Sequence, residues 1–93
     1  MSLHDEAISQ YLRDQPSFER HLAERLGVAL RGEDGTDFVA AGAVDGVAIL
    51  LLQTEAEQIA GERFPSELVE AIDSLDDWYH FTVVKAGHQS SPE

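Results

Sequence analysis

Apolar residues at the start of the chain recur every three to four positions, which is the spacing of one face of an α-helix. This pattern predicts a first helix over residues 3–13. Because a proline disfavours the helical conformation of the residue before it, Pro16 should separate this helix from a second one. We expect Gly27 to end the second helix. Its apolar side chains are four residues apart and are Phe18, Leu22 and Leu26.

After residue 28 the apolar spacing changes towards two, and turns rich in glycine and aspartate divide the sequence. The segments between these turns are predicted strands over residues 28–31, 37–44 and 47–54. The pair Asp45-Gly46 favours a type I′ hairpin, because both residue types tolerate a positive φ. Residues 47–52 are all apolar, so we expect the third strand to be central and covered on both faces.

The second half of the chain predicts a return to helix and then a last strand. Thr54 and Glu57 have the spacing of a capping box, which indicates a helical segment over residues 55–75 that Pro65 divides or kinks. Alternating residues over 78–84 predict the strand.

The predicted order is therefore ααβββα(α)β. We expect residues 1–86 to form a single small α+β domain, with an antiparallel sheet of about four strands packed against helices. Residues 87–93 contain little that could be buried and are a predicted mobile tail.

The size and composition of the chain limit its class. A chain of 93 residues and 10.2 kDa buries roughly 64% of its surface on folding, enough for one modest core. The longest apolar run has six residues, against about 20 in a membrane-spanning helix. The N-terminal sequence lacks the pattern of a secretory signal or transit peptide, and cysteine is absent. We therefore expect a cytoplasmic protein.

Charge is distributed unevenly along the sequence. Residues 1–32 hold five acids and four arginines, whereas residues 33–93 hold thirteen acids, Arg63 and Lys85, so nearly all of the net charge of −12 lies in the later part. Eight of these acids fall between residues 55 and 77 and are Glu55, Glu57, Glu62, Glu67, Glu70, Asp73, Asp76 and Asp77. On a continuous helix, Glu70, Asp73 and Asp77 would lie within about 60° of one another, opposite the apolar side.

Four explanations of this acidity are compatible with the sequence. The carboxylates could be ordinary solvated surface, an adaptation to a high-salt cytoplasm, in part a result of genomic base bias against lysine, or a face that binds a basic partner. Solvated surface is the common case, and the physical argument for a binding face is that like charges one turn apart destabilise a helix slightly unless a cation or partner meets them. The candidate partner-binding residues are Glu67, Glu70, Asp73, Asp76 and Asp77, with Trp78 or Tyr79 as an aromatic anchor.

Catalytic and metal-binding patterns are weak. The four histidines have no metal-ligand spacing, and Asp73, Asp76 and Asp77 lack the pattern of a calcium-binding loop. No nucleophile elbow or phosphate-binding glycine loop is present. His80 should share one face of the predicted strand with Trp78 and Thr82. It is the residue type for proton transfer, but a sheet-surface role is the simpler interpretation. We expect a protein that is not an enzyme and holds no cofactor or metal.

These observations favour a small acidic, non-catalytic binding protein. It would be an inhibitor that blocks the basic surface of a nuclease or nucleic-acid-binding complex with an acidic helix face, as immunity proteins, antitoxins, anti-CRISPR proteins and DNA mimics do. Direct binding to nucleic acid or to an anionic membrane is disfavoured by the negative charge. One alternative is a structural or assembly protein that forms a homodimer and is acidic only for solubility. Another is a small hydrolase that presents His80 beside carboxylates in a cleft.

Overall fold

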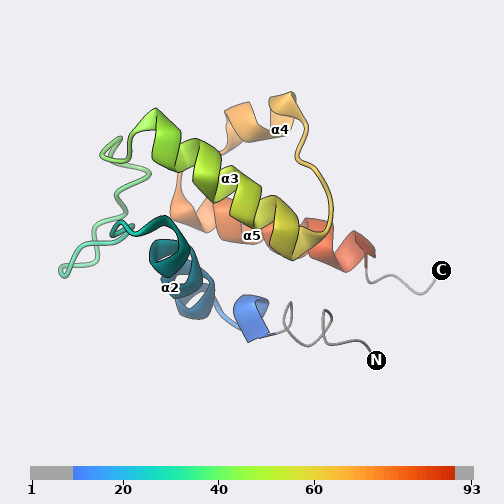
Figure 1. Ribbon diagram of the computed structural model, residues 1–93, viewed down its shortest axis with the longest axis horizontal. Coiled ribbons are helices and arrows are strands. Elements are labelled where there is room, and N and C mark those ends of the chain that lie inside the picture. The colour runs from blue at the N-terminus through green and yellow to red at the C-terminus, as the bar shows by residue number, and fades with distance from the viewer. Residues whose placement is uncertain (1–9, 90–93) are drawn as a thin grey trace.

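The computed structural model describes residues 10–89, and the side chains of residues 10–87. Its helices are α2 (Gln15–Leu26), α3 (Gly46–Ala60), α4 (Ser66–Ala71) and α5 (Leu75–Gln89). Helices α2, α3 and α5 pack against one another in pairs, and the short α4 lies outside this group (Figure 1). The first predicted helix falls mostly outside the described residues, which begin with a helical segment at residues 10–12.

Helix α2 confirms the second predicted helix and its end at Gly27, whereas its cap at Asp14 was not predicted. The side chain of Asp14 caps its start by accepting a hydrogen bond of 2.9 Å from the backbone N–H of Ser17. Pro16 lies in the first turn, where the missing N–H has no consequence. Gly27 ends the helix with φ of 74°, a left-handed conformation that favours glycine.

The predicted α+β class is wrong, because the described residues contain no sheet. Among residues 10–89 the only β pairing is a single bridge between Arg31 and Asp37. The segments 28–31 and 37–44, predicted as strands, form a loop with tight turns. The Asp37 side chain explains part of this result, since its Oδ1 accepts the backbone N–H groups of Val39 and Ala40 at 3.0 Å and folds the chain back.

The third predicted strand, residues 47–54, is the first half of α3 instead. Asp45 caps this helix by accepting the N–H of Ala48 at 2.8 Å and forms no hairpin turn with Gly46. A short apolar run without alternation fits a strand or a helix equally well, and the helix formers that follow it extend the run to Ala60. Thr54 starts no helix, because its hydroxyl donates to the carbonyl of Leu50 inside α3.

The predicted last strand, residues 78–84, lies within α5. Its buried residues are three or four positions apart, as on one face of a helix: Leu75, Trp78, Thr82 and Ala86. The alternating pattern of residues 78–84 is therefore too short to be distinguished from the period of about 3.6 residues of a helix. Helix α5 continues to Gln89, through the first three residues of the predicted tail, and residues 90–93 lie outside the described residues. Mobility of the tail stays a prediction.

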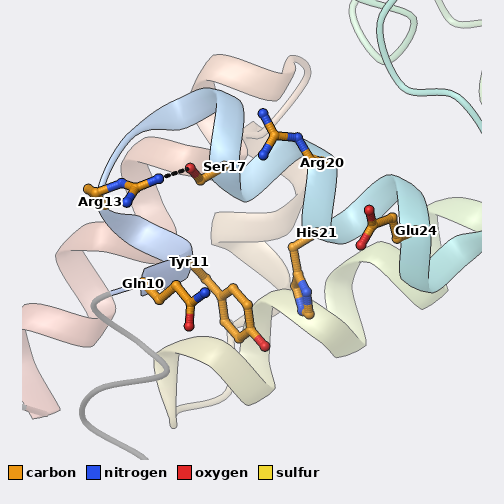
Figure 2. A pocket seen from close by; sticks show the side chains of 7 residues that line it. All are labelled: Gln10, Tyr11, Arg13, Ser17, Arg20, His21 and Glu24. Carbon is orange, nitrogen blue, oxygen red and sulfur yellow. Dashed lines mark hydrogen bonds between the residues drawn. The ribbon is translucent and has the colours of Figure 1, made fainter.

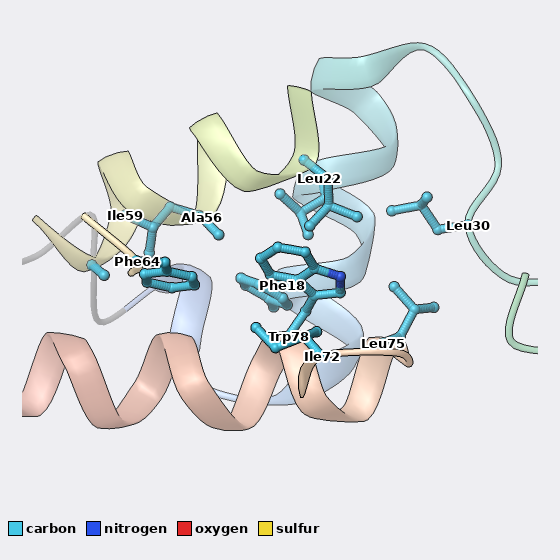
Figure 3. Close-up of a cluster of buried hydrophobic side chains, with 11 residues drawn as sticks. Phe18, Leu22, Leu30, Ala56, Ile59, Phe64, Ile72, Leu75 and Trp78 are labelled. Atoms are coloured by element: carbon cyan, nitrogen blue, oxygen red, sulfur yellow. The ribbon is translucent and has the colours of Figure 1, made fainter. Parts of the chain in front are cut away.

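The core is made by one face of each long helix, joined by the loop before α3. Figure 3 shows Trp78 from α5 lying among Phe18 and Leu22 of α2 and Ile72 from the turn after α4. Trp78 is 1% exposed and its ring stacks on that of Phe64, with 6.0 Å between the centroids. The loop adds Leu30 and is tied to α5, because the backbone N–H of Leu75 donates to Asp37 at 2.8 Å.

No helix among the described residues combines the length and the apolar character that crossing a bilayer would require.

Candidate protein-binding surface

The acids of residues 55–77 do not lie on one helix. Helix α4 ends at Ala71, Ile72 is extended with φ of −90° and ψ of 120°, and α5 begins at Leu75. Glu70, Asp73 and Asp77 therefore belong to α4, to the turn and to α5, and the prediction that they share one helix face is wrong.

Several of these acids have partners within the fold. Glu55 lies 3.4 Å from Arg25 of α2, and Glu62 lies 3.3 Å from Lys85 of α5. Glu57 accepts the backbone N–H of Phe64 at 3.0 Å, which holds the chain where it leaves α3. These carboxylates connect elements of the fold and are not available to a partner without breaking those contacts.

Two predicted site residues, Asp76 and Asp77, lie in the first turn of α5, where negative charge stabilises the helix dipole. Asp76 accepts a hydrogen bond from Gln15 and lies 3.9 Å from Arg31. Asp77 accepts the backbone N–H of Asp73 at 3.3 Å, while its own N–H donates to the hydroxyl of Ser74. Both aspartates thus help to start α5, although the side chain of Asp76 is largely exposed.

Three predicted site residues remain exposed at α4 and the turn after it: Glu67, Glu70 and Asp73. We call them the α4 acidic surface. Within the described residues none of the three carboxylates forms an ion pair. Glu67 and Glu70 are one turn apart on α4 and so project from the same side of it. The structure therefore leaves three of the five predicted acids exposed and without an ion pair in the described residues.

The two predicted aromatic anchors are not free at the surface. Trp78 is in the core, as described above. Tyr79 is half-buried, packs at 5.5 Å from the ring of Phe18 and donates its hydroxyl hydrogen to the carbonyl of Leu12 at 2.9 Å. Both rings stabilise the helix packing, and neither extends the α4 acidic surface.

An exposed apolar face on α3 was missed from the sequence. Val47, Leu50 and Leu51 are 70%, 64% and 50% exposed. They are three and four residues apart and form one stripe, which Thr54 continues without a charged side chain. The signal was in the sequence: once residues 46–60 are taken as a helix, its apolar residues cover more than one face, and only one of those faces can meet the core.

An open cleft of about 230 Å³ lies beside α2 and was also missed (Figure 2). We call it the α2 cleft. It is lined by Gln10, Tyr11, Arg13, Ser17, Arg20, His21 and Glu24. The rings of Tyr11 and His21 stack with 3.9 Å between centroids. Burial lowers the pKa of His21, partly opposed by the negative charge of Glu55, whose carboxylate lies 3.8 Å from Nε2.

His80 is exposed on α5, with its ring edge-on to that of Phe81 at 5.1 Å. Trp78 and Thr82 point into the core, so the expectation that these three residues share one face is wrong. His80 lines neither the α2 cleft nor the shallow hollow at the end of α3. In the described part of the chain, no group of three or more histidine, aspartate or glutamate side chains is arranged to hold a metal ion.

No protein-family model, curated protein sequence or solved structure matches this chain. The functional argument therefore rests on the surfaces described above.

Proposed function

We propose that the protein is a non-catalytic binding module that uses the α4 acidic surface to engage a basic surface on a nuclease or a nucleic-acid-binding protein. The observation that carries the proposal is the difference between the acids. Glu55, Glu62 and Asp76 lie beside cations of their own chain, whereas the carboxylates of the α4 acidic surface have no such neighbour in the described residues.

The proposed mechanism is steering followed by occupation. A net charge of −12 attracts a basic partner at distances up to about the Debye length. The exposed carboxylates would then occupy the sites on the partner that bind the phosphates of nucleic acid. Helix α4 is suited to adjust on contact, because it has only six residues and is not among the helices that pack in pairs. The absence of cysteine fits a reducing compartment, so we place the encounter in the cytoplasm.

The test is a double charge reversal, Glu67→Lys with Glu70→Lys. The matched control is Glu24→Lys with Glu33→Lys, which changes the net charge equally at two other exposed acids. Tagged proteins are incubated with lysate of the native host and washed at about 50 mM and then about 500 mM salt. Candidate partners are then purified, and their nuclease or nucleic-acid-binding activity is measured with and without each variant.

We expect the unaltered protein to retain a basic partner at low salt and to inhibit it. The Glu67/Glu70 variant should lose at least tenfold in affinity, about 1.4 kcal/mol, while the control keeps its binding. Equal loss in both variants would show that only net charge matters and would refute the α4 acidic surface as the site. Retention without inhibition would refute the inhibitor role.

A second candidate, a homodimer formed through α3, is favoured by the exposed stripe of Val47, Leu50 and Leu51. Because this stripe carries no charge, two copies can meet across it without bringing carboxylates together. A single helix face is smaller than the roughly 800 Å² per partner of a standard interface, so the dimer would be weak.

Sedimentation equilibrium tests the dimer directly. The unaltered protein should dimerise at a concentration of about 100 μM. Its Kd should be micromolar or weaker, which corresponds to a favourable binding free energy of at most about 8 kcal/mol. Leu50→Glu should make it monomeric and leave the helical circular dichroism unchanged, since this side chain is exposed. A monomer at all concentrations would eliminate this candidate.

A further inference from the structure

The α2 cleft is lined by two arginines, Arg13 and Arg20, in a molecule of net charge −12. Among the described side chains, Arg25, Arg31 and Lys85 each lie beside a glutamate, at 3.4, 2.7 and 3.3 Å. Arg20, like Arg63 outside the cleft, has no ion pair and no side-chain hydrogen bond within residues 10–87. Arg13 lies 3.5 Å from Asp14, at a site where both side chains are more than half exposed.

Figure 2 shows how these side chains are placed. Arg13, Ser17 and Arg20 lie along one rim of the cleft, and Arg13 donates a hydrogen bond of 3.2 Å to the hydroxyl of Ser17. Gln10 and Tyr11 lie along the other rim. The rims therefore present two guanidinium groups, a hydroxyl and an amide to the same space.

Arg13 and Arg20 both line the cleft, and the Asp14 partner of Arg13 is itself exposed, so both guanidinium groups are accessible to an anion that enters it. Arginine presents several N–H donors in a planar fork, which matches the oxygens of a phosphate group and can donate two hydrogen bonds at once. The Ser17 hydroxyl and the Gln10 amide add neutral donors of the kind that accompany arginine at phosphate sites. The stacked Tyr11 and His21 rings give this space a fixed wall.

We infer that the α2 cleft binds a small molecule carrying one phosphate group and, at its other end, an amine or hydroxyl. The volume of about 230 Å³ lies below the 300–1,000 Å³ of pockets for drug-sized ligands, which suits a ligand with a small organic part. Glu24 lies at the opposite end of the cleft from Arg13. Its carboxylate would repel a second phosphate and accept a hydrogen bond from an amine or hydroxyl. This inference is independent of the α4 acidic surface.

The binding test is a titration of the full chain followed by amide chemical shifts in NMR spectra. The probes are inorganic phosphate, phosphoethanolamine and acetate. Phosphate should shift the signals of Tyr11, Ser17 and His21 and saturate with Kd of about 1 mM, phosphoethanolamine should bind several-fold tighter, and acetate at least about tenfold weaker. No saturable shift with either phosphate compound would overturn the inference, as would equal binding of acetate.

Two charge-neutralising variants locate the site. Arg20→Gln should weaken phosphate binding at least about tenfold, whereas Arg63→Gln, the same change at an exposed arginine outside the cleft, should leave it within about twofold. Equal weakening by both would show a general charge effect and refute the cleft. Both arginines are exposed, so neither change should unfold the protein, and circular dichroism checks this.

Glu24→Gln tests whether the ligand lies in the cleft with its amine or hydroxyl end at Glu24. It should strengthen the binding of inorganic phosphate, because a repulsive charge is removed, and abolish the preference for phosphoethanolamine. An unchanged preference would refute the role of Glu24.

A short phosphoserine peptide is the last probe. If the peptide binds more tightly than phosphoethanolamine, the ligand is a phosphorylated chain and the small-molecule assignment is overturned.

Discussion

Trp78 lies at the centre of the packing described above. It is the largest fully buried side chain, and it belongs to the core that α2, α3 and α5 form together (Figure 3). Its neighbour one turn later, Thr82, is also buried but donates its hydroxyl hydrogen to the carbonyl of Trp78 at 2.6 Å. The buried polar group is thereby satisfied, so the face of α5 against the core carries no unpaired hydroxyl.

Trp78→Ala should lower the free energy of unfolding by about 3–5 kcal/mol, because it leaves a cavity among residues that cannot close it. Small domains have only about 5–15 kcal/mol in total, so the variant should be largely destabilised. Urea unfolding followed by circular dichroism measures the change. Val84→Ala, on the exposed side of the same helix, is the control and should stay within about 0.5 kcal/mol. Similar losses in both variants would contradict the packing described here.

His21 should make stability depend on pH. Burial lowers its pKa in the folded state below the ordinary value of 6.5, so the unfolded chain takes up the proton more readily. Its contribution to stability is therefore complete above pH 6.5 and is lost as the pH falls through the folded-state pKa. His21→Phe retains a ring against Tyr11 but cannot be protonated, so its stability should fall less between pH 7.5 and 5.5. A steeper loss of stability in the variant than in the unaltered protein over this pH range would contradict the proposed direction of the His21 effect.

At the scale of elements, the ends of the helices are set by local chemistry. Asp14 and Asp45 cap α2 and α3, and each of these helices ends at a glycine with φ of 74°, Gly27 and Gly61. Helix α4 has no side-chain cap and only six residues. It is held by the partly buried Leu68 and Val69 and by the buried Ile72. It is thus the least secured helix, which suits a segment that must fit a partner's surface.

Asp45→Ala should destabilise the protein by about 1 kcal/mol, because the N–H of Ala48 loses the acceptor that starts α3. Glu33→Ala removes the same charge from an exposed position in the preceding loop and is the matched control. Chemical unfolding of both variants measures the difference. If Glu33→Ala were equally destabilising, the effect would be one of net charge and the cap would be unimportant.

At the scale of the whole molecule, an excess of twelve negative charges opposes folding by self-repulsion. Screening should relieve it, since the Debye length falls from about 30 Å at 0.01 M to about 3 Å at 1 M salt. We expect the melting temperature to rise between these NaCl concentrations, by several degrees for each kcal/mol gained. The Glu67→Lys, Glu70→Lys variant should show a smaller rise. A melting temperature that is constant or falls would mean that the internal ion pairs outweigh the repulsion.

The sequence by itself determined the features that depend on neighbouring residues. Asp14, Pro16 and Gly27 define α2 through local hydrogen bonds and backbone preferences, and the concentration of acids after residue 33 follows directly from the chain. Only the tertiary structure decided the states of residues 47–54 and 78–84. The first is a short apolar run and the second a short alternating one, and whether such segments form strands or helices depends on what covers them.

Tertiary structure also decided which parts of the candidate site are free. From the sequence, Asp76, Glu67 and Trp78 were equivalent members of one acidic, aromatic segment. The fold brings Arg31 to Asp76, buries Trp78 against Phe64 and leaves Glu67 in solvent. These outcomes depend on contacts between residues far apart in the chain, and the spacing of residues within one segment carries no information about them.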